Sequence, residues 1–315
     1  MFNNIIYFII VLLIFNVGYQ KTAPEDSLVY TLVMLSFTWL VFAALCKWSF
    51  QGLINRIKAD KESDVALTVE YHKLILRLSV LAIFLFTLAI FLFHLRYWLQ
   101  AIPGFKHFSV LQGALAITVF VFYLMTIWYF SYPVYVFAFE AKIPRRSFVI
   151  SNLRLNLPIL FPWVILSFIY DLVSFTPWAG SERILNEPEG QIIFFGSFLI
   201  ILMIFMPHFI QYCWGCRPYR SSEKVRLLED FLREKGFKYR SLLKWPIFES
   251  RMTTAGIMGV VPRYRYILVT DALMEILSTE ELKAVIAHEM GHAKYKHMLF
   301  YVLFILGYVF ALPGF

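Results

Sequence analysis

Long apolar stretches with almost no charged residue limit what this sequence can fold into. A helix needs about 20 apolar residues to cross the hydrocarbon core of a bilayer. The sequence contains seven such apolar stretches, and most of them approach that length, although the first and the third are shorter. The composition agrees, because 60% of the 315 residues are hydrophobic and 16% are charged, whereas typical soluble domains have roughly 25% charged residues. The stretches lie at residues 4–18, 28–46, 79–95, 109–130, 155–175, 191–210 and 298–314.

We therefore expect an α-helical polytopic membrane protein with one small polar lobe. Residues 1–210 would form a membrane domain of about six transmembrane helices, and residues 298–315 would form a seventh. Between them, residues 211–297 predict an α+β lobe. A lobe of fewer than about 90 residues buries little core alone, so we expect the membrane helices to support it.

The local pattern of the lobe predicts one helix followed by strands. Ser222 is suited to cap a helix that runs to about Lys235, where Gly236 would end it. Strand-like stretches follow at residues 237–245 and 256–269, and the second of them turns near Pro262.

Lysine and arginine are distributed unequally between the loops. The loops at residues 47–78 and 140–154 hold ten of them, and the alternate loops hold four. The rule that cytoplasmic loops are richer in lysine and arginine then places the basic loops and the lobe on the cytoplasmic side. The same rule explains the net charge of +8. Because these basic residues are interleaved with acids and flank the apolar stretches, we expect the lipid bilayer, and not nucleic acid, as their partner. The ten are Lys47, Arg56, Lys58, Lys61, Lys73, Arg77, Lys142, Arg145, Arg146 and Arg154, and the four are Lys21, Arg96, Lys106 and Arg183.

The stretch "AVIAHEMGHAKYKH" at residues 284–297 contains His288, Glu289 and His292 in the spacing H-E-x-x-H. Two histidines four residues apart on a helix lie on one face, roughly 6 Å from each other, so both imidazoles can reach one metal ion. This spacing permits a mechanism in which His288 and His292 hold zinc. Glu289 then takes a proton from the water that attacks a peptide carbonyl.

The residues before the motif predict that it lies on a helix. Ser278 followed by Glu281 is the pattern of a capping box, in which each residue satisfies a backbone N–H of the other. Leu282, Val285 and Ile286 then supply an apolar face.

The longer run "GVVPRYRYILVTDALMEILSTEELKAVIAHEMGHAKYKH", residues 259–297, resembles the membrane-bound zinc metallopeptidases that include the heat-shock protease HtpX and the CAAX prenyl endopeptidase. In that family a strand leads through a turn like that at Thr270 and Asp271 into a short helix, here residues 273–277. An S-x-E-E cap, here residues 278–281, and the H-E-x-x-H helix follow.

The resemblance implies a zincin-like lobe with Zn²⁺ as cofactor, His288 and His292 as metal ligands and Glu289 as catalytic base. It implies a zinc metalloendopeptidase of the bacterial inner membrane that hydrolyses peptide bonds of membrane-associated or misfolded proteins. It also implies that an edge strand binds the extended substrate, although Thr254 and Ala255 stand where the family usually has Asn-Ala. The strand comprises Thr254, Ala255, Gly256, Ile257, Met258 and Gly259.

The third zinc ligand is not evident in the sequence. In the resembled family a glutamate on a later helix completes the site, but no acidic residue follows Glu289 here. His297 is five residues past His292, which turns it by about 140° around the helix and away from the zinc face. We therefore expect the chain to be truncated before the third ligand, unless a partner chain supplies it. The alternative is a non-catalytic remnant or membrane scaffold that lacks a complete zinc site.

Two other features lie outside this motif. Cys213 and Cys216 form C-W-G-C, but no second pair accompanies them and the preceding apolar stretch ends at the reducing face of the membrane, so a functional dithiol is not expected. Asp171 lies in an apolar stretch, where a charge is costly. Either it makes a polar contact with another helix or it lies near the membrane interface.

Overall fold

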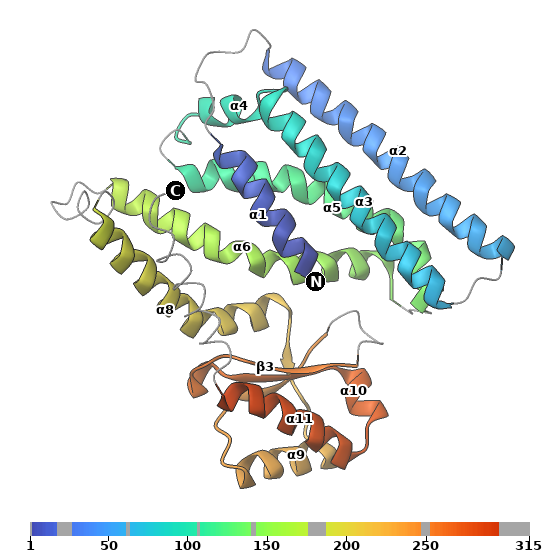
Figure 1. Ribbon diagram of the computed structural model, residues 1–315, viewed down its shortest axis with the longest axis vertical. Coiled ribbons are helices and arrows are strands. Elements are labelled where there is room, and N and C mark those ends of the chain that lie inside the picture. The colour runs from blue at the N-terminus through green and yellow to red at the C-terminus, as the bar shows by residue number, and fades with distance from the viewer. Residues whose placement is uncertain are drawn as a thin grey trace. The chain divides into compact units, whose positions relative to one another are not determined.

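The computed structural model describes residues 2–17, 27–60, 64–105, 108–139, 143–175, 187–246 and 253–295. The chain divides into two compact units, Met1–Gly190 and Gln191–Phe315. The described part of the first unit is helical. The described part of the second combines a long apolar helix with a small α+β lobe (Figure 1).

Seven of the described helices belong to the apolar part of the chain. Their lengths follow from the sequence, because a chain in lipid must satisfy its backbone hydrogen bonds within each helix. They are α1 (Phe2–Asn16), α2 (Leu28–Asp60), α3 (Asp64–Phe91), α4 (Leu95–Ala101), α5 (Ser109–Phe139), α6 (Arg145–Phe175) and α8 (Pro188–Cys213).

Five of these helices, α2, α3, α5, α6 and α8, are long and apolar enough to cross a membrane. The predicted polytopic membrane fold is confirmed. The expected first span corresponds to α1, a shorter apolar helix of 15 residues, so six spans before the lobe stays a prediction. The expected seventh span, residues 298–314, lies outside the described residues.

Helix α5 forms the centre of the first unit and packs against α2, α3 and α6 (Figure 1). Phe120 of α5 is fully buried and meets the rings of Phe8 and Phe86 edge to face, at centroid distances of 5.7 and 6.1 Å. On α2, by contrast, apolar side chains such as Phe37 and Trp48 are exposed. Such outward apolar faces suit contact with lipid.

Asp171 makes a polar contact between two helices of this unit. Its side chain is buried on α6, and its Oδ2 accepts a hydrogen bond of 2.9 Å from the backbone N–H of Val110, in the first turn of α5. The first turn of a helix has N–H groups without helical partners and a partial positive charge, and a carboxylate satisfies both. The contact with another helix, one of the two sequence interpretations, is therefore present.

The lobe is a four-stranded sheet with helices on one face. Its strands have the order β1-β2-β4-β3, in which β2 and β4 are parallel and the other two pairs are antiparallel. The elements are β1 (Arg217–Pro218), α9 (Glu223–Glu234), β2 (Ser241–Lys244), β3 (Ala255–Met258), the 3₁₀ turn η1 (Pro262–Tyr264), β4 (Tyr266–Val269), α10 (Asp271–Ile276) and α11 (Thr279–Lys294).

Alternate residues of β4 face the two sides of the sheet. Ile267 and Val269 pack into a core with buried residues of α9 and α11, and Figure 1 shows these two helices on the same side of the sheet. Tyr266 and Leu268 pack on the opposite side, near Trp214 and Trp245. All four β4 side chains are buried, so β4 is the central support of the lobe.

The sequence predictions for the lobe are correct in type and approximate in extent. The expected helix is α9, capped by Ser222 and followed by Gly236 in a left-handed conformation. The strands are shorter than expected, and the turn predicted near Pro262 is η1. Gly259 enters this turn at φ 108°, where a side chain would also collide with the carbonyl oxygen of Tyr264.

Candidate active site

Helix α11 carries the H-E-x-x-H motif and begins at the predicted capping box. The backbone N–H of Glu281 donates to Ser278 Oγ at 3.3 Å, and the backbone N–H of Ser278 donates to Glu281 Oε2 at 2.8 Å. The Ser278 hydroxyl, which donates to Glu281 Oε2 at 2.6 Å, and then the Ser278 backbone N–H lower the pKa of Glu281. The cap fixes where the helix starts and therefore which residues face the core.

The core-facing side of α11 carries Leu282 and Ile286, both fully buried. The helix packs against β3 and α9. His288 and His292 lie one turn apart and are exposed, whereas Glu289 is half-buried. The apolar pattern of the sequence thus leaves the two imidazoles accessible.

The two imidazoles converge on one another. His288 Nε2 and His292 Nε2 are 3.3 Å apart, and their rings are nearly perpendicular, with centroids 4.9 Å apart. Two nitrogen ligands at about 2.0–2.1 Å from one tetrahedral zinc ion are separated by about 3.3 Å. The donor set therefore fits two of the ligand positions of such an ion.

A third ligand is not found in the part of the chain that the structure describes. No group of three or more His, Cys, Asp or Glu side chains there could hold a metal ion. His297, the nearest substitute considered from the sequence, lies outside the described residues.

The predicted substrate residues, Thr254 to Gly259, include the whole of β3, the last strand of the described sheet. Among the described strands β3 pairs only with β4, in the register Ala255 with Val269 and Met258 with Tyr266. Because α11 packs against this strand, the motif helix and a sheet edge are neighbours, as Figure 1 shows.

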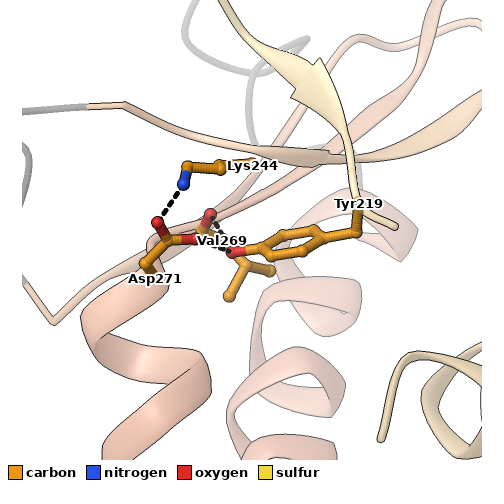
Figure 2. Close-up of polar contacts among 4 residues, drawn as sticks. All are labelled: Tyr219, Lys244, Val269 and Asp271. Atoms are coloured by element: carbon orange, nitrogen blue, oxygen red, sulfur yellow. Dashed lines mark hydrogen bonds and ion pairs between the residues drawn. The ribbon is translucent and has the colours of Figure 1, made fainter. Parts of the chain in front are cut away.

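The Thr-Asp turn between β4 and α10 holds several elements together, and Figure 2 shows its polar contacts. The single proton of Tyr219 Oη is shared between two acceptors, the carbonyl oxygen of Val269 at 3.0 Å and Asp271 Oδ1 at 3.3 Å. Lys244 forms an ion pair with Asp271 Oδ2. Burial, and then the nearby Asp271 carboxylate, raise the pKa of Tyr219, which therefore remains a donor.

Sequence reasoning placed Asp271 in this turn but missed both of its partners. Tyr219 and Lys244 lie far from Asp271 along the chain and reach it only because β1, β2 and β4 are aligned in one sheet. The available signal was a basic residue at the end of a predicted strand.

Cys213 and Cys216 are free thiols. Cys216 packs beside Leu243, Tyr266 and Leu268, and burial raises its pKa to about 12. A thiol of that pKa stays protonated near neutral pH and is a poor nucleophile and metal ligand. The surroundings of Cys216 therefore favour a packing role.

Residues 220–312 match peptidase family M48. This range contains α9, β2, β3, β4, α10 and α11. The match confirms the resemblance predicted from the motifs: over these residues the chain is similar to peptidase family M48.

Particular relatives extend this result. The chain is 40% identical over 53 residues to the "Protease HtpX homolog" of Thermodesulfovibrio yellowstonii, which covers 17% of this chain and 19% of that protein. It is 25% identical over 148 residues to "Protease HtpX homolog 2" of Methanosarcina acetivorans, which covers 47% of this chain and 49% of that protein. The chain thus matches about half or less of the length of these curated relatives.

A solved structure shares the fold. The crystal structure of S. mikatae Ste24p matches with a TM-score of 0.50 at 14% identity, over 91% of this chain and 72% of that one. At this identity the likeness concerns the fold alone. It agrees with a polytopic helical protein that carries a small sheet.

Proposed function

We propose that this chain belongs to a membrane-embedded zinc metalloendopeptidase that hydrolyses peptide bonds of membrane-associated or misfolded proteins. The observation that carries the proposal is the 3.3 Å approach of His288 Nε2 and His292 Nε2 on a helix that packs against a sheet edge. The match of the lobe to a peptidase family supports it.

The chain supplies three side chains for this chemistry. His288 and His292 would hold Zn²⁺ through their Nε2 atoms, with Glu289 next to them on α11. Bound zinc would polarise the scissile carbonyl and make the attacking water more acidic. The Glu289 carboxylate would accept a proton from that water and pass it to the leaving nitrogen.

We propose that β3 binds the substrate as an additional strand. An extended peptide can pair through its backbone with an open sheet edge and then needs little sequence specificity. The position of β3 at the end of the described sheet, beside α11, supports this role. Such backbone pairing suits a protease that accepts many unfolded segments.

The zinc site needs one more protein ligand, because catalytic zinc usually has three protein ligands and one open position. We propose that a carboxylate from outside these 315 residues completes it, from a longer form of the chain or from a partner chain. In the part of the chain that the structure describes, no third His, Cys, Asp or Glu side chain joins His288 and His292 in a metal-binding group, and for this reason we propose a further ligand.

We also propose that residues 211–297 face the cytoplasm and that the protein lies in the bacterial inner membrane. The unequal distribution of lysine and arginine between the loops supports this orientation. Five membrane-length helices in the described chain are compatible with it if α1 also crosses the membrane or lies at its surface.

Cleavage by an extended chain tests the function. Residues 1–315 would be followed by a returning membrane helix and a helix of the pattern E-x-x-x-D, with a membrane protein as substrate. Glu289→Gln should abolish cleavage and leave zinc bound, because only the base is lost. Glu280→Gln on the same helix is the matched control, since Glu280 is exposed and pairs with Lys283.

The same experiment separates the enzyme from the alternative, a non-catalytic scaffold or remnant. A scaffold would show no zinc-dependent cleavage in the extended form, and Glu289→Gln would change nothing. Equal cleavage by the Glu289→Gln and Glu280→Gln variants would contradict the assigned base.

A further inference from the structure

Thr270, the residue between β4 and α10, makes an unusual pair of hydrogen bonds with Thr254. Its side chain is buried, with an exposed fraction of 3%. Its Oγ1 donates to the carbonyl oxygen of Thr254 at 3.1 Å and accepts from the backbone N–H of Thr254, also at 3.1 Å. One hydroxyl thus satisfies both backbone groups of the residue that precedes β3.

In a regular antiparallel ladder the backbone N–H of Thr254 would donate to the carbonyl oxygen of Thr270. Here it donates to the Thr270 hydroxyl instead. The backbone N–H of Thr270 donates to the carbonyl oxygen of Thr254 at 3.1 Å, as in an ordinary antiparallel pair. The carbonyl oxygen of Thr270 does not return the bond and instead accepts from the backbone N–H of Met274, in the first turn of α10, at 3.1 Å. The side chain therefore extends the pairing of β3 by one residue while the main chain turns into the helix.

The residue after Thr270 contacts the strands that lie on the opposite side of β4 from β3. Asp271 is tied to Lys244 at the end of β2 and to Tyr219 next to β1, as Figure 2 shows. The turn is thereby anchored to the interior strands, and the Thr270 hydroxyl connects this anchor to the sheet edge.

We propose that Thr270 is a positioning residue, whose hydroxyl holds Thr254 so that β3 presents its outer edge to substrate in a fixed register. The proposal rests on the proposed function of β3. Residues alternate in an antiparallel ladder between bonding the partner strand and facing away from it. With Thr254 bonded to Thr270, the backbone groups of Ala255 and Ile257 are directed away from β4, where an extended peptide would pair.

Hydrogen exchange tests the first half of the proposal in the full chain. Thr270→Val keeps the shape of the side chain and removes the hydroxyl, whereas Thr270→Ser keeps the hydroxyl. Exchange of the amides in residues 253–258 should become about ten-fold faster in Thr270→Val and stay near wild type in Thr270→Ser. Thr118→Val is the matched control, because it makes the same chemical change at a threonine whose hydroxyl donates to the carbonyl oxygen of Ala114 within α5, outside the lobe.

Peptide binding tests the second half and needs no catalytic activity. The probe is a fluorescein-labelled hexapeptide of alternating valine and threonine, measured by fluorescence anisotropy in the presence of zinc. Thr270→Val should bind it roughly three- to ten-fold more weakly than wild type. Thr270→Ser and Thr118→Val should bind it as wild type does.

The outcomes separate this proposal from the proposed function. Unchanged exchange at residues 253–258 in Thr270→Val overturns the positioning role, even where the hexapeptide binds. Faster exchange without weaker binding also overturns it, because the order of Thr254 would then not matter to substrate. A wild-type chain that does not bind the hexapeptide contradicts the proposed substrate edge itself.

Discussion

Glu289 and the two histidines of its motif have different surroundings, although one turn of α11 carries all three. His288 and His292 are exposed, and Glu289 is half-buried. In the proposed site, a third ligand and a substrate can therefore approach the metal from outside the helix. The partly shielded carboxylate keeps fewer orientations, which suits a base that must meet one water.

Cys216 provides a prediction at the same scale. Because only the thiolate reacts with maleimides and burial raises the pKa of Cys216 to about 12, the thiolate fraction is small below that pH and increases as pH rises toward it. In the folded protein at pH 8, N-ethylmaleimide should label Cys216 more than about ten-fold more slowly than in the unfolded chain. Mass spectrometry of the labelled peptide measures this. Equal rates in both states would show that Cys216 is accessible and reactive, against the packing role.

At the scale of elements, the capping box determines where α11 begins. Ser278→Ala should lower the stability of the lobe by about 0.5–2 kcal/mol, the usual cost of losing such an N-cap. Thermal unfolding of the detergent-solubilised chain measures the effect. Ser278→Thr, which keeps a capping hydroxyl, is the control. An unchanged melting temperature in Ser278→Ala would mean that the cap contributes nothing to the folded lobe.

The cap also predicts a pH dependence. The folded-state pKa of Glu281 is lowered from 4.5, so its contribution is present above about pH 4.5 and is lost as pH falls through the lowered value. The difference in melting temperature between wild type and Glu281→Gln should therefore shrink as the pH is reduced from 7 to 3. A difference that grows in acid would contradict the assigned hydrogen bonds.

The elements also show what sequence reasoning can and cannot predict. Local signals, such as the caps at Ser222 and Ser278, located α9 and α11 correctly. Hydropathy found the apolar part of α3 but not its start at Asp64, because the first turns of that helix are polar. Contacts such as Tyr219 with Asp271 were not predictable, since they depend on the strand order. The two hydrogen bonds between Thr254 and the Thr270 hydroxyl were not predictable for the same reason.

At the scale of the whole molecule, the proposed orientation predicts where tags will appear. A reporter fused near Lys244 should behave as cytoplasmic, and one fused near Asn186 as external, because the lysine and arginine distribution favours the side of the lobe. Alkaline phosphatase and fluorescent protein fusions measure this. Both reporters on the same side would mean that the number of spans before the lobe is wrong by one.

The most direct test of the two-histidine site is zinc retention by the 315-residue chain and by its extended form. Two imidazoles hold zinc more weakly than a complete set of three ligands. After dialysis against a chelator, we predict about one zinc ion per chain in the extended form and little in the 315-residue chain. His292→Ala should remove it from the extended form, whereas His72→Ala, on α3, should not. Stoichiometric, chelator-resistant zinc in the 315-residue chain, together with peptide cleavage that Glu289→Gln abolishes, would contradict this account.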